Sequence, residues 1–289
     1  MPDIMSQSQS DHCSAWRTLW RCLRTIEHLS TGALILVWVS LVSRTNARPA
    51  WLPGVVRWWF GRLCRALGVR VAPAGGLAPR CLLVCNHISW LDVIVLGAQG
   101  QMSFLSKSEV RRWPLIGWMS AVVGTHFIER GANQVGAVAA RISAAMTAGE
   151  TLLIFPEGTT SEGAGVLPFH PRLFAIVQQP GLGIQPVALA YRSGDAPPPV
   201  RCIAFVDDQT LFANLWRLLR HPDLVAEVRF LEPLQVEPVD DRRRLARRAR
   251  AAILATLGLP EQAGLDIQVR PRPRPRARLL EGRLAPEGE

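Results

Sequence analysis

The N-terminal part of the chain carries two amphipathic patterns separated by an apolar run. In 14–29, apolar residues recur at the spacing of one helix face, and arginines fall on the other side. A second helical pattern, 51–67, also mixes tryptophan and other apolar residues with arginines. Between them, the uncharged sequence of 29–43 is 15 residues long, whereas about 20 are needed to cross a bilayer core. We therefore expect helices that lie in a membrane interface; a true span, or helices that cover a soluble sheet, are the alternatives.

The middle of the chain alternates short apolar runs with helical patterns. Strands are expected at 81–85, 102–106, 122–128, 151–155, 184–191, 201–206 and 226–231. Helices are expected at 91–98, 133–148, 168–178 and 209–220. This alternation predicts an α/β fold in which helices pack on a central sheet.

The C-terminal part is rich in arginine. An Arg/Ala-rich stretch after Asp240 predicts a helix that reaches Leu257, and the Arg-Pro alternation of 270–276 is expected to be extended or disordered. The patterns together divide the chain into N-terminal membrane-associating helices (1–70), a catalytic domain (71–240) and a basic Arg/Pro-rich tail (241–289).

The net charge of +10 is carried by the two ends of the chain. Residues 1–70 hold 9 arginines and 3 acidic residues, net +6, and residues 241–289 hold 12 and 6, again net +6. The middle, 71–240, holds 12 basic and 14 acidic residues, net −2. Basic flanks suit attachment to an anionic membrane surface, and a purely solubilising role is the alternative. Because the middle is not basic and no nucleic-acid-reading motif accompanies the tail, no nucleic acid is expected as a partner.

Missing motifs exclude several classes of protein. The six cysteines form no CxxC pair and no zinc-finger spacing with histidine, so no metal is expected. The G-x-S-x-G serine elbow of ester hydrolases is missing from the sequence. The glycine-rich phosphate loops of nucleotide-binding enzymes are missing as well.

The strongest chemical signal is the heptapeptide NHISWLD at 86–92, directly after the expected strand 81–85. A histidine can act as a base near neutral pH, and a carboxylate that fixes its tautomer improves it. On one straight helix, residues i and i+5 do not face each other. His87 and Asp92 meet if His87 lies in the turn after the strand and Asp92 in the first turn of the next helix. The alternative is that Asp92 only caps that helix and His87 is an ordinary turn residue.

Three further blocks follow in order: GTHFIER at 124–130, FPEGTTS at 155–161 and IQPVAL at 184–189. Together with 86–92 they resemble the glycerolipid acyltransferase family, which includes the 1-acylglycerol-3-phosphate acyltransferases. The resemblance covers about 80–235. It implies an α/β fold of the glycerol-3-phosphate acyltransferase type, with a central mixed sheet flanked by helices. It also implies transfer of a fatty acyl group from acyl-CoA or acyl carrier protein to the hydroxyl of a lysolipid.

The resemblance assigns roles to residues of the four blocks. It implies that His87 is the general base and that Asp92 orients it. It also implies that Arg130 binds the phosphate of the acceptor; a surface ion pair with Glu129 or Glu150 is the alternative. The remaining expected substrate-binding residues are Asn86, Glu157, Gly158 and Thr159. Pro186, in the fourth block, is expected at a sheet edge or bulge, where it shapes the acyl-donor groove.

One residue departs from the commonest pattern of the family, which has an arginine after Glu-Gly-Thr; this chain has Thr160. The variant resembles a bacterial branch that includes lyso-ornithine-lipid acyltransferases. We expect an O-acyltransferase of phospholipid biosynthesis that converts 1-acylglycerol-3-phosphate to phosphatidic acid. The alternatives are a lyso-ornithine-lipid O-acyltransferase and a non-catalytic membrane protein that retains the fold. Acyl-CoA or acyl carrier protein would be the co-substrate, without a further cofactor, at the cytoplasmic face of the inner membrane.

Overall fold

The structure is a computed structural model. It describes residues 4–42, 51–107, 125–128, 135–147, 149–178, 181–194, 200, 202–206, 209–237 and 239–261.

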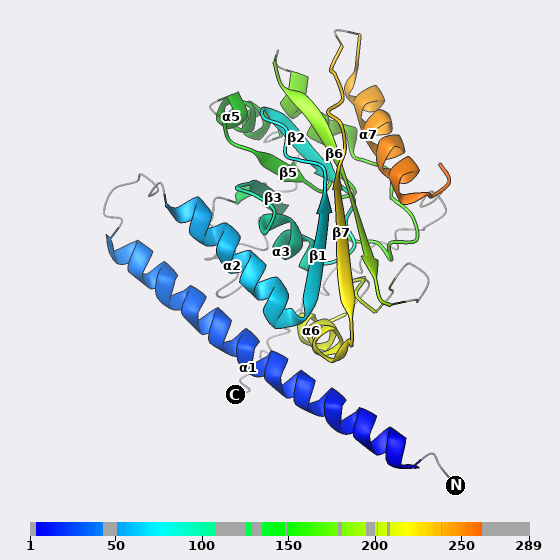
Figure 1. The fold of residues 1–289 in the computed structure, drawn as a ribbon. Coiled ribbons are helices and arrows are strands. Elements are labelled where there is room, and N and C mark those ends of the chain that lie inside the picture. The colour runs from blue at the N-terminus through cyan, green and yellow to red at the C-terminus, as the bar shows by residue number, and fades with distance from the viewer. Residues whose placement is uncertain are drawn as a thin grey trace, which may run out of the picture.

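Seven strands form one mixed sheet in the order β1-β7-β6-β2-β5-β3-β4 (Figure 1). Neighbouring strands run parallel except β6 and β7, which are antiparallel. The strands are β1 (Val69–Ala74), β2 (Cys81–Cys85), β3 (Ser103–Lys107), β4 (His126–Ile128), β5 (Leu152–Ile154), β6 (Gly183–Arg192) and β7 (Leu224–Phe230). The expected α/β fold with a central mixed sheet is therefore confirmed.

Helices cover both faces of this sheet. One face packs against α2 (Leu52–Leu67), α3 (Leu91–Gly97) and α6 (Leu211–Arg220). The other packs against α5 (Val135–Thr147), the 3-10 helix η2 (Pro171–Gln178) and α7 (Arg242–Leu257). Successive side chains of a strand point to opposite faces, so the fully apolar β2 supplies both cores. Leu83 and Cys85 face the α3 side, and Leu82 and Val84 face the α7 side.

The long first helix, α1 (Ile4–Val42), packs on α2 and α6 (Figure 1). The sequence predicts a helix only over 14–29 and a separate apolar run after it, but the two are continuous. By length and composition, Ala15–Val39 could cross a membrane. Several of its large apolar side chains are exposed, including Trp16, Leu34 and Trp38.

Helix ends follow local capping chemistry. The Thr210 hydroxyl accepts a hydrogen bond from the N–H of Ala213 at the start of α6, and Asp241 caps α7 in the same way. Gly68 ends α2 with φ +78°, a left-handed conformation that glycine adopts without strain. The capped ends of α2, α6 and α7 lie within a few residues of the boundaries expected from the sequence.

Three elements differ from the sequence-based prediction. The edge strand β1 was not predicted, because only Val69 among its residues is buried and Pro73 interrupts its pattern. The expected strand 201–206 is wrong for 202–206, which is irregular. Its buried residues Ile203 and Ala204 pack in the core on the α3 side. A short apolar run of this kind has the same sequence pattern as a buried strand. The expected helix 168–178 is a 3-10 helix over 171–178, and 168–170 are irregular.

Pro186 lies inside β6, a central strand, so the expected edge position is wrong. Its ladder partner on β2 is Val84, and pairing with β7 begins one residue later, at Val187. The Pro186 carbonyl accepts a hydrogen bond from the Leu231 N–H, just beyond the end of β7. The missing proline N–H therefore falls where the neighbouring strand has already ended.

Candidate functional site

The site forms where β2 passes into α3. Cys85 ends the strand and Leu91 begins the helix, so 86–90 is the connecting turn. β2 lies between β5 and β6 and is parallel to both, so the segments that leave the carboxyl ends of β2 and β5 meet here. Ligand sites of open α/β sheets occur at such ends.

Asn86 fixes the start of the turn to β6. Its Nδ2 donates to the carbonyl of Leu189 at 2.9 Å, and its Oδ1 accepts from the Leu189 N–H at 2.9 Å. The side chain is buried. Asn86 thus continues the pairing of β2 with β6 through its amide, and its expected direct contact with substrate has no support in this geometry.

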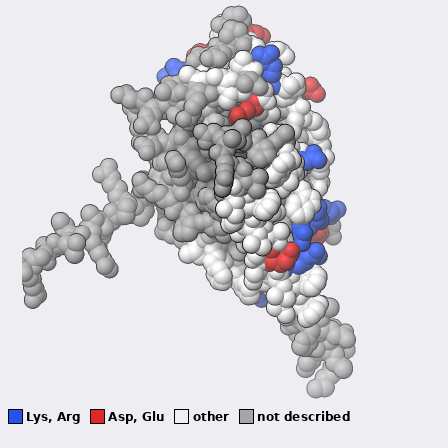
Figure 2. Space-filling view, turned by 90° about the vertical axis from the view of Figure 1, so that its left-hand side faces the viewer, with Lys and Arg blue, Asp and Glu red and all other residues white. Residues whose placement is uncertain are grey.

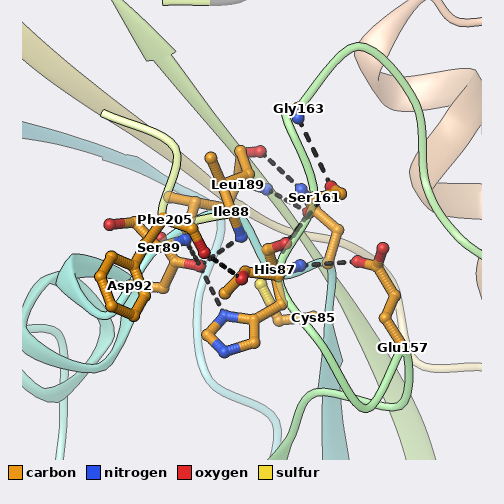
Figure 3. Close-up of polar contacts among 12 residues, drawn as sticks. Cys85, His87, Ile88, Ser89, Asp92, Glu157, Ser161, Gly163, Leu189 and Phe205 are labelled. Atoms are coloured by element: carbon orange, nitrogen blue, oxygen red, sulfur yellow. Dashed lines mark hydrogen bonds and ion pairs between the residues drawn. The ribbon is translucent and has the colours of Figure 1, made fainter. Parts of the chain in front are cut away.

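His87 and Asp92 lie in direct contact, as the spacing predicts. The His87 Nδ1 is 2.8 Å from Asp92 Oδ2 (Figure 3). A carboxylate only accepts, so Nδ1 carries the proton and Nε2 has the free lone pair. Asp92 Oδ2 also accepts from the N–H groups of Ile88 at 2.7 Å and Ser89 at 3.0 Å. The turn therefore orients the carboxylate before the histidine contacts it.

Tyr191 holds the second oxygen of the same carboxylate. Its hydroxyl donates to Asp92 Oδ1 at 2.7 Å, and both side chains are buried. Burial, and then the nearby Asp92 charge, raise the pKa of Tyr191 well above its usual range, so the hydroxyl stays a donor. Four donors thus converge on Asp92. A carboxylate buried in a protein normally has its oxygens hydrogen-bonded in this way.

The His87 ring is held from one side by Phe155. The two rings stack with centroids 4.0 Å apart and an interplanar angle of 16°. The His87 side chain keeps 19% of its surface exposed, whereas Asp92 has none. A histidine with one nitrogen on a carboxylate, a packed ring face and a partly exposed edge can exchange a proton with a ligand.

Glu157 holds the backbone on the other side of His87 (Figure 3). Its Oε1 accepts from the His87 N–H at 2.6 Å, and its Oε2 accepts from the Leu167 N–H at 2.8 Å. Burial raises the pKa of Glu157 to about 8, against the opposing effect of these two N–H groups. Glu157 therefore positions the turn, and the expectation that it binds substrate directly has no support in these contacts.

The turn after β5 brings residues 158–161 beside His87. Gly158 has φ +68°, and its N–H donates to the Phe155 carbonyl at 3.1 Å. The Ser161 N–H donates to the His87 carbonyl at 2.8 Å. Thr159 is half-buried in this turn.

The hydroxyl of Thr160 donates to the Phe205 carbonyl. The Phe205 N–H in turn donates to the Ile88 carbonyl at 3.0 Å. The irregular segment 202–206 is therefore bonded to both motif turns, which explains why its backbone does not join the sheet.

One expected ligand is not placed by the structure. Arg130 lies outside the described residues, as does Glu129, so their roles stay predictions. Glu150 is described, and its carboxylate lies 3.5 Å from the His126 ring. Among the residues that the structure describes, no three His, Cys, Asp or Glu side chains gather in a way that could hold a metal ion.

The sequence did not identify Tyr191, Phe155 or Leu167 as parts of the site. Tyr191 is the one tyrosine of the chain, and strand alternation could have found it. Leu189 and Tyr191 share a face of β6 with Val187, the ladder partner of Cys85. That face continues under α3, where Asp92 lies.

Comparison with known proteins identifies the class. The family model for the acyltransferase family matches residues 65–190. A lyso-ornithine lipid O-acyltransferase of Pseudomonas aeruginosa is 39% identical over 252 residues, which cover 83% of this chain and 93% of that protein. The chain therefore belongs to the acyltransferase family, and the resemblance of its four blocks is confirmed.

Other relatives carry two kinds of name. A lyso-ornithine lipid O-acyltransferase of Brucella abortus is 37% identical, over 69% of this chain and 80% of that protein. A 1-acyl-sn-glycerol-3-phosphate acyltransferase of Neisseria gonorrhoeae is 30% identical, over 61% and 69%. The crystal structure of the 1-acyl-sn-glycerophosphate acyltransferase PlsC of Thermotoga maritima matches with a TM-score of 0.61 at 16% identity, over 86% of this chain and 98% of that one. That last likeness confirms the fold.

Proposed function

We propose that this acyltransferase moves a fatty acyl group from an acyl thioester to the free hydroxyl of a lysolipid, and that the acceptor is lyso-ornithine lipid. The relatives with the higher identity and the longer overlap carry that name. The sequence alone favours 1-acylglycerol-3-phosphate, which becomes the second candidate; the relative from Neisseria gonorrhoeae and the presence of Arg130 favour it.

The residue at position 160 is the observation that favours lyso-ornithine lipid as the acceptor. It stands where the commonest family pattern has an arginine, and its hydroxyl is engaged by the Phe205 carbonyl. A guanidinium is the side chain best suited to phosphate, and threonine supplies no charge. An ornithine headgroup offers a carboxylate and an ammonium group but no phosphate. Arg130 remains our proposed ligand for an anionic group of the acceptor.

His87 starts the transfer as a general base. Its Nε2 takes the proton of the acceptor hydroxyl while that oxygen attacks the thioester carbonyl. The tetrahedral intermediate then expels the thiolate, which takes the proton back from Nε2. A new ester and a free thiol result, without a covalent acyl-enzyme.

Asp92 stabilises the imidazolium that forms in this step. It also holds the Nδ1 proton in place at 2.8 Å, so Nε2 is always the basic nitrogen. The oxyanion needs donors of its own. Because the Gly158 N–H already donates to Phe155, we assign this role to the turn around Thr159 instead.

The acyl donor is acyl-CoA or acyl carrier protein, and no further cofactor enters this chemistry. We place the enzyme at the cytoplasmic face of the inner membrane, where a lysolipid acceptor is found. The exposed large apolar residues of α1 support membrane contact. On the face that Figure 2 shows, basic and acidic groups lie near the top and the lower right of the described surface.

Acyl transfer from a labelled acyl thioester to a panel of lysolipids tests the proposal. Lyso-ornithine lipid, 1-acylglycerol-3-phosphate and other lysophospholipids are compared, with the His87→Ala variant as the blank. Preference for lyso-ornithine lipid is expected. A preference for 1-acylglycerol-3-phosphate would establish the second candidate, and transfer by folded His87→Ala protein would remove His87 from the mechanism.

A pair of variants at Thr160 tests the acceptor choice directly. Thr160→Arg is expected to raise kcat/KM for 1-acylglycerol-3-phosphate on the order of tenfold relative to lyso-ornithine lipid, since a charge-assisted bond to phosphate is worth roughly 1.5–3 kcal/mol. Thr160→Val is the matched control, because it loses the bond to Phe205 without gaining a charge. Equal selectivity in the two variants would show that this position does not read the acceptor headgroup.

A further inference from the structure

Helix α6 presents aromatic and basic side chains outward. Phe212 is 76% exposed and Trp216, one turn later, is 44% exposed. Arg217 and Arg220 are exposed beside them, and so is Ala213. At about 100° per residue these five positions fall within an arc of about 140°, which we call the α6 outer face.

The opposite side of α6 is already used by the core. Leu218 and Leu219 are buried against the sheet, and Asn214 is buried as well. The aromatic residues of the outer face therefore have no core to enter. α6 contains no acidic residue, so the outer face is both apolar and positively charged. An amphipathic helix of this kind is suited to the headgroup region of an anionic bilayer.

The outer face adjoins the helix that supports membrane contact. α1 packs on α6, and the guanidinium of Arg21 donates to the carbonyls of Leu219 and His221 at the C-terminal end of α6. A cation at this end of a helix is favourable. α1 also has an exposed apolar stripe: at about 100° per residue, its large exposed apolar residues share one arc of about 120°, and they are Trp16, Leu19, Trp20, Leu23, Ile26, Leu34, Val37, Trp38 and Leu41.

α6 is bonded to the catalytic turn through its buried side. The Asn214 Oδ1 accepts from the Trp90 indole N–H at 2.8 Å, two residues before Asp92. The Asn214 Nδ2 donates to the Ala204 carbonyl at 3.0 Å, next to Phe205. The same helix thus faces solvent with two aromatic rings and contacts both segments that frame His87.

We propose that the α6 outer face inserts into the surface of an anionic membrane and sets the catalytic turn at the level where a lysolipid exposes its hydroxyl. This inference rests on the proposed membrane association and extends it from α1 to the catalytic domain. Phe212 and Trp216 enter the interface between headgroups and acyl chains, and Arg217 and Arg220 bind the anionic headgroups.

Quenching of Trp216 fluorescence measures the insertion. Full-length protein is bound to vesicles of phosphatidylglycerol and phosphatidylethanolamine that contain a phosphatidylcholine brominated on its acyl chain. Because the chain has ten tryptophans, the Trp216 signal is taken as the difference between the native chain and Trp216→Phe, which keeps an aromatic ring. Bromine quenching of that difference signal is expected, and a signal equal to that with unbrominated vesicles would overturn the proposal.

Two variants and a matched control measure the contribution to binding. Phe212→Ser with Trp216→Ser is expected to weaken vesicle binding on the order of tenfold. Arg217→Gln with Arg220→Gln is expected to do so by a similar factor, but only when phosphatidylglycerol is present. Arg243→Gln with Arg247→Gln removes the same charge from exposed positions of α7, which lies away from α6 in Figure 1. The vesicle binding of this control is expected to stay near that of the native chain. A loss equal to that of the α6 arginine variant would show that binding depends only on net charge.

Activity assays separate this proposal from the proposed function. For the α6 variants, KM for a vesicle-embedded lysolipid is expected to rise on the order of tenfold, while transfer to a short-chain, monomeric lysolipid is unchanged. A loss confined to acyl carrier protein as donor, with vesicle binding intact, would assign the α6 outer face to that protein and overturn the membrane proposal. If the native chain transfers to no acceptor, the proposed function fails, yet quenching and binding still decide the α6 proposal because neither needs turnover.

Discussion

Asp92→Asn isolates what the Asp92 charge contributes to catalysis, because the geometry of the site can accommodate the amide. Asp92 Oδ2 accepts three hydrogen bonds, so the amide oxygen must take that position. The amide NH₂ then faces the Tyr191 hydroxyl, which can turn from donor to acceptor. The histidine stays oriented, and only the negative charge is lost.

The size of the effect follows from the ion pair that forms during the reaction. With about 4 Å between the charge centres of an imidazolium and a carboxylate, an effective dielectric of about 20 gives roughly 4 kcal/mol. Since about 1.4 kcal/mol corresponds to a factor of ten in rate, kcat is expected to fall about a thousandfold.

Initial rates of acyl transfer at saturating lysolipid measure this loss, and thermal unfolding in detergent checks that the variant is folded. His87→Ala and the double variant with Asp92→Asn provide the control. If the two residues act as one unit, the double variant is no slower than His87→Ala. A kcat within about tenfold of the native value would refute the idea that Asp92 stabilises an imidazolium.

Two further variants probe the groups that hold this site. Tyr191→Phe removes a buried bond to a charged oxygen, so the free energy of unfolding is expected to fall by about 1.5–3 kcal/mol; no change on chemical denaturation would mean that Asp92 Oδ1 has another donor. For Glu157, burial raises the pKa from the usual 4.5 of a glutamate to about 8, so between these values the folded protein holds a proton that the unfolded chain has lost, and it loses stability as pH rises through this window. The loss is roughly 5 kcal/mol. Glu157→Gln is expected to lack this slope in unfolding measured from pH 4 to pH 9, whereas parallel curves would show that folding does not raise the pKa of Glu157.

The sequence predicted the parts of the structure that depend on local pattern. The fully apolar β2 and the spacing of His87 and Asp92 predict the strand, the turn and the contact between the two side chains. The amphipathic patterns around 51–67 and 209–220 likewise predict α2 and α6 to within two residues.

The parts that the sequence missed depend on tertiary contacts. Residues 202–206 are as apolar as a strand, but their backbone bonds to Ile88 and Thr160 instead of to a ladder. Tyr191 reaches Asp92 across 99 positions of sequence, a pairing that no local pattern encodes. For Glu157, whose binding to substrate stays a prediction, the structure adds two backbone N–H groups that its oxygens accept from, and the motif does not encode them.

Two bonds that fix the catalytic turn come from main-chain groups of distant segments. The His87 carbonyl accepts a hydrogen bond from the Ser161 N–H, and the Ile88 carbonyl accepts one from the Phe205 N–H. An N–H is supplied by nearly every residue type, so these two main-chain bonds do not depend on which side chain stands at either position. What cannot vary is the number of residues that delivers each N–H to its carbonyl. Single-residue insertions or deletions near 161 or 205 should therefore be purged by selection far more strictly than substitutions at the same positions.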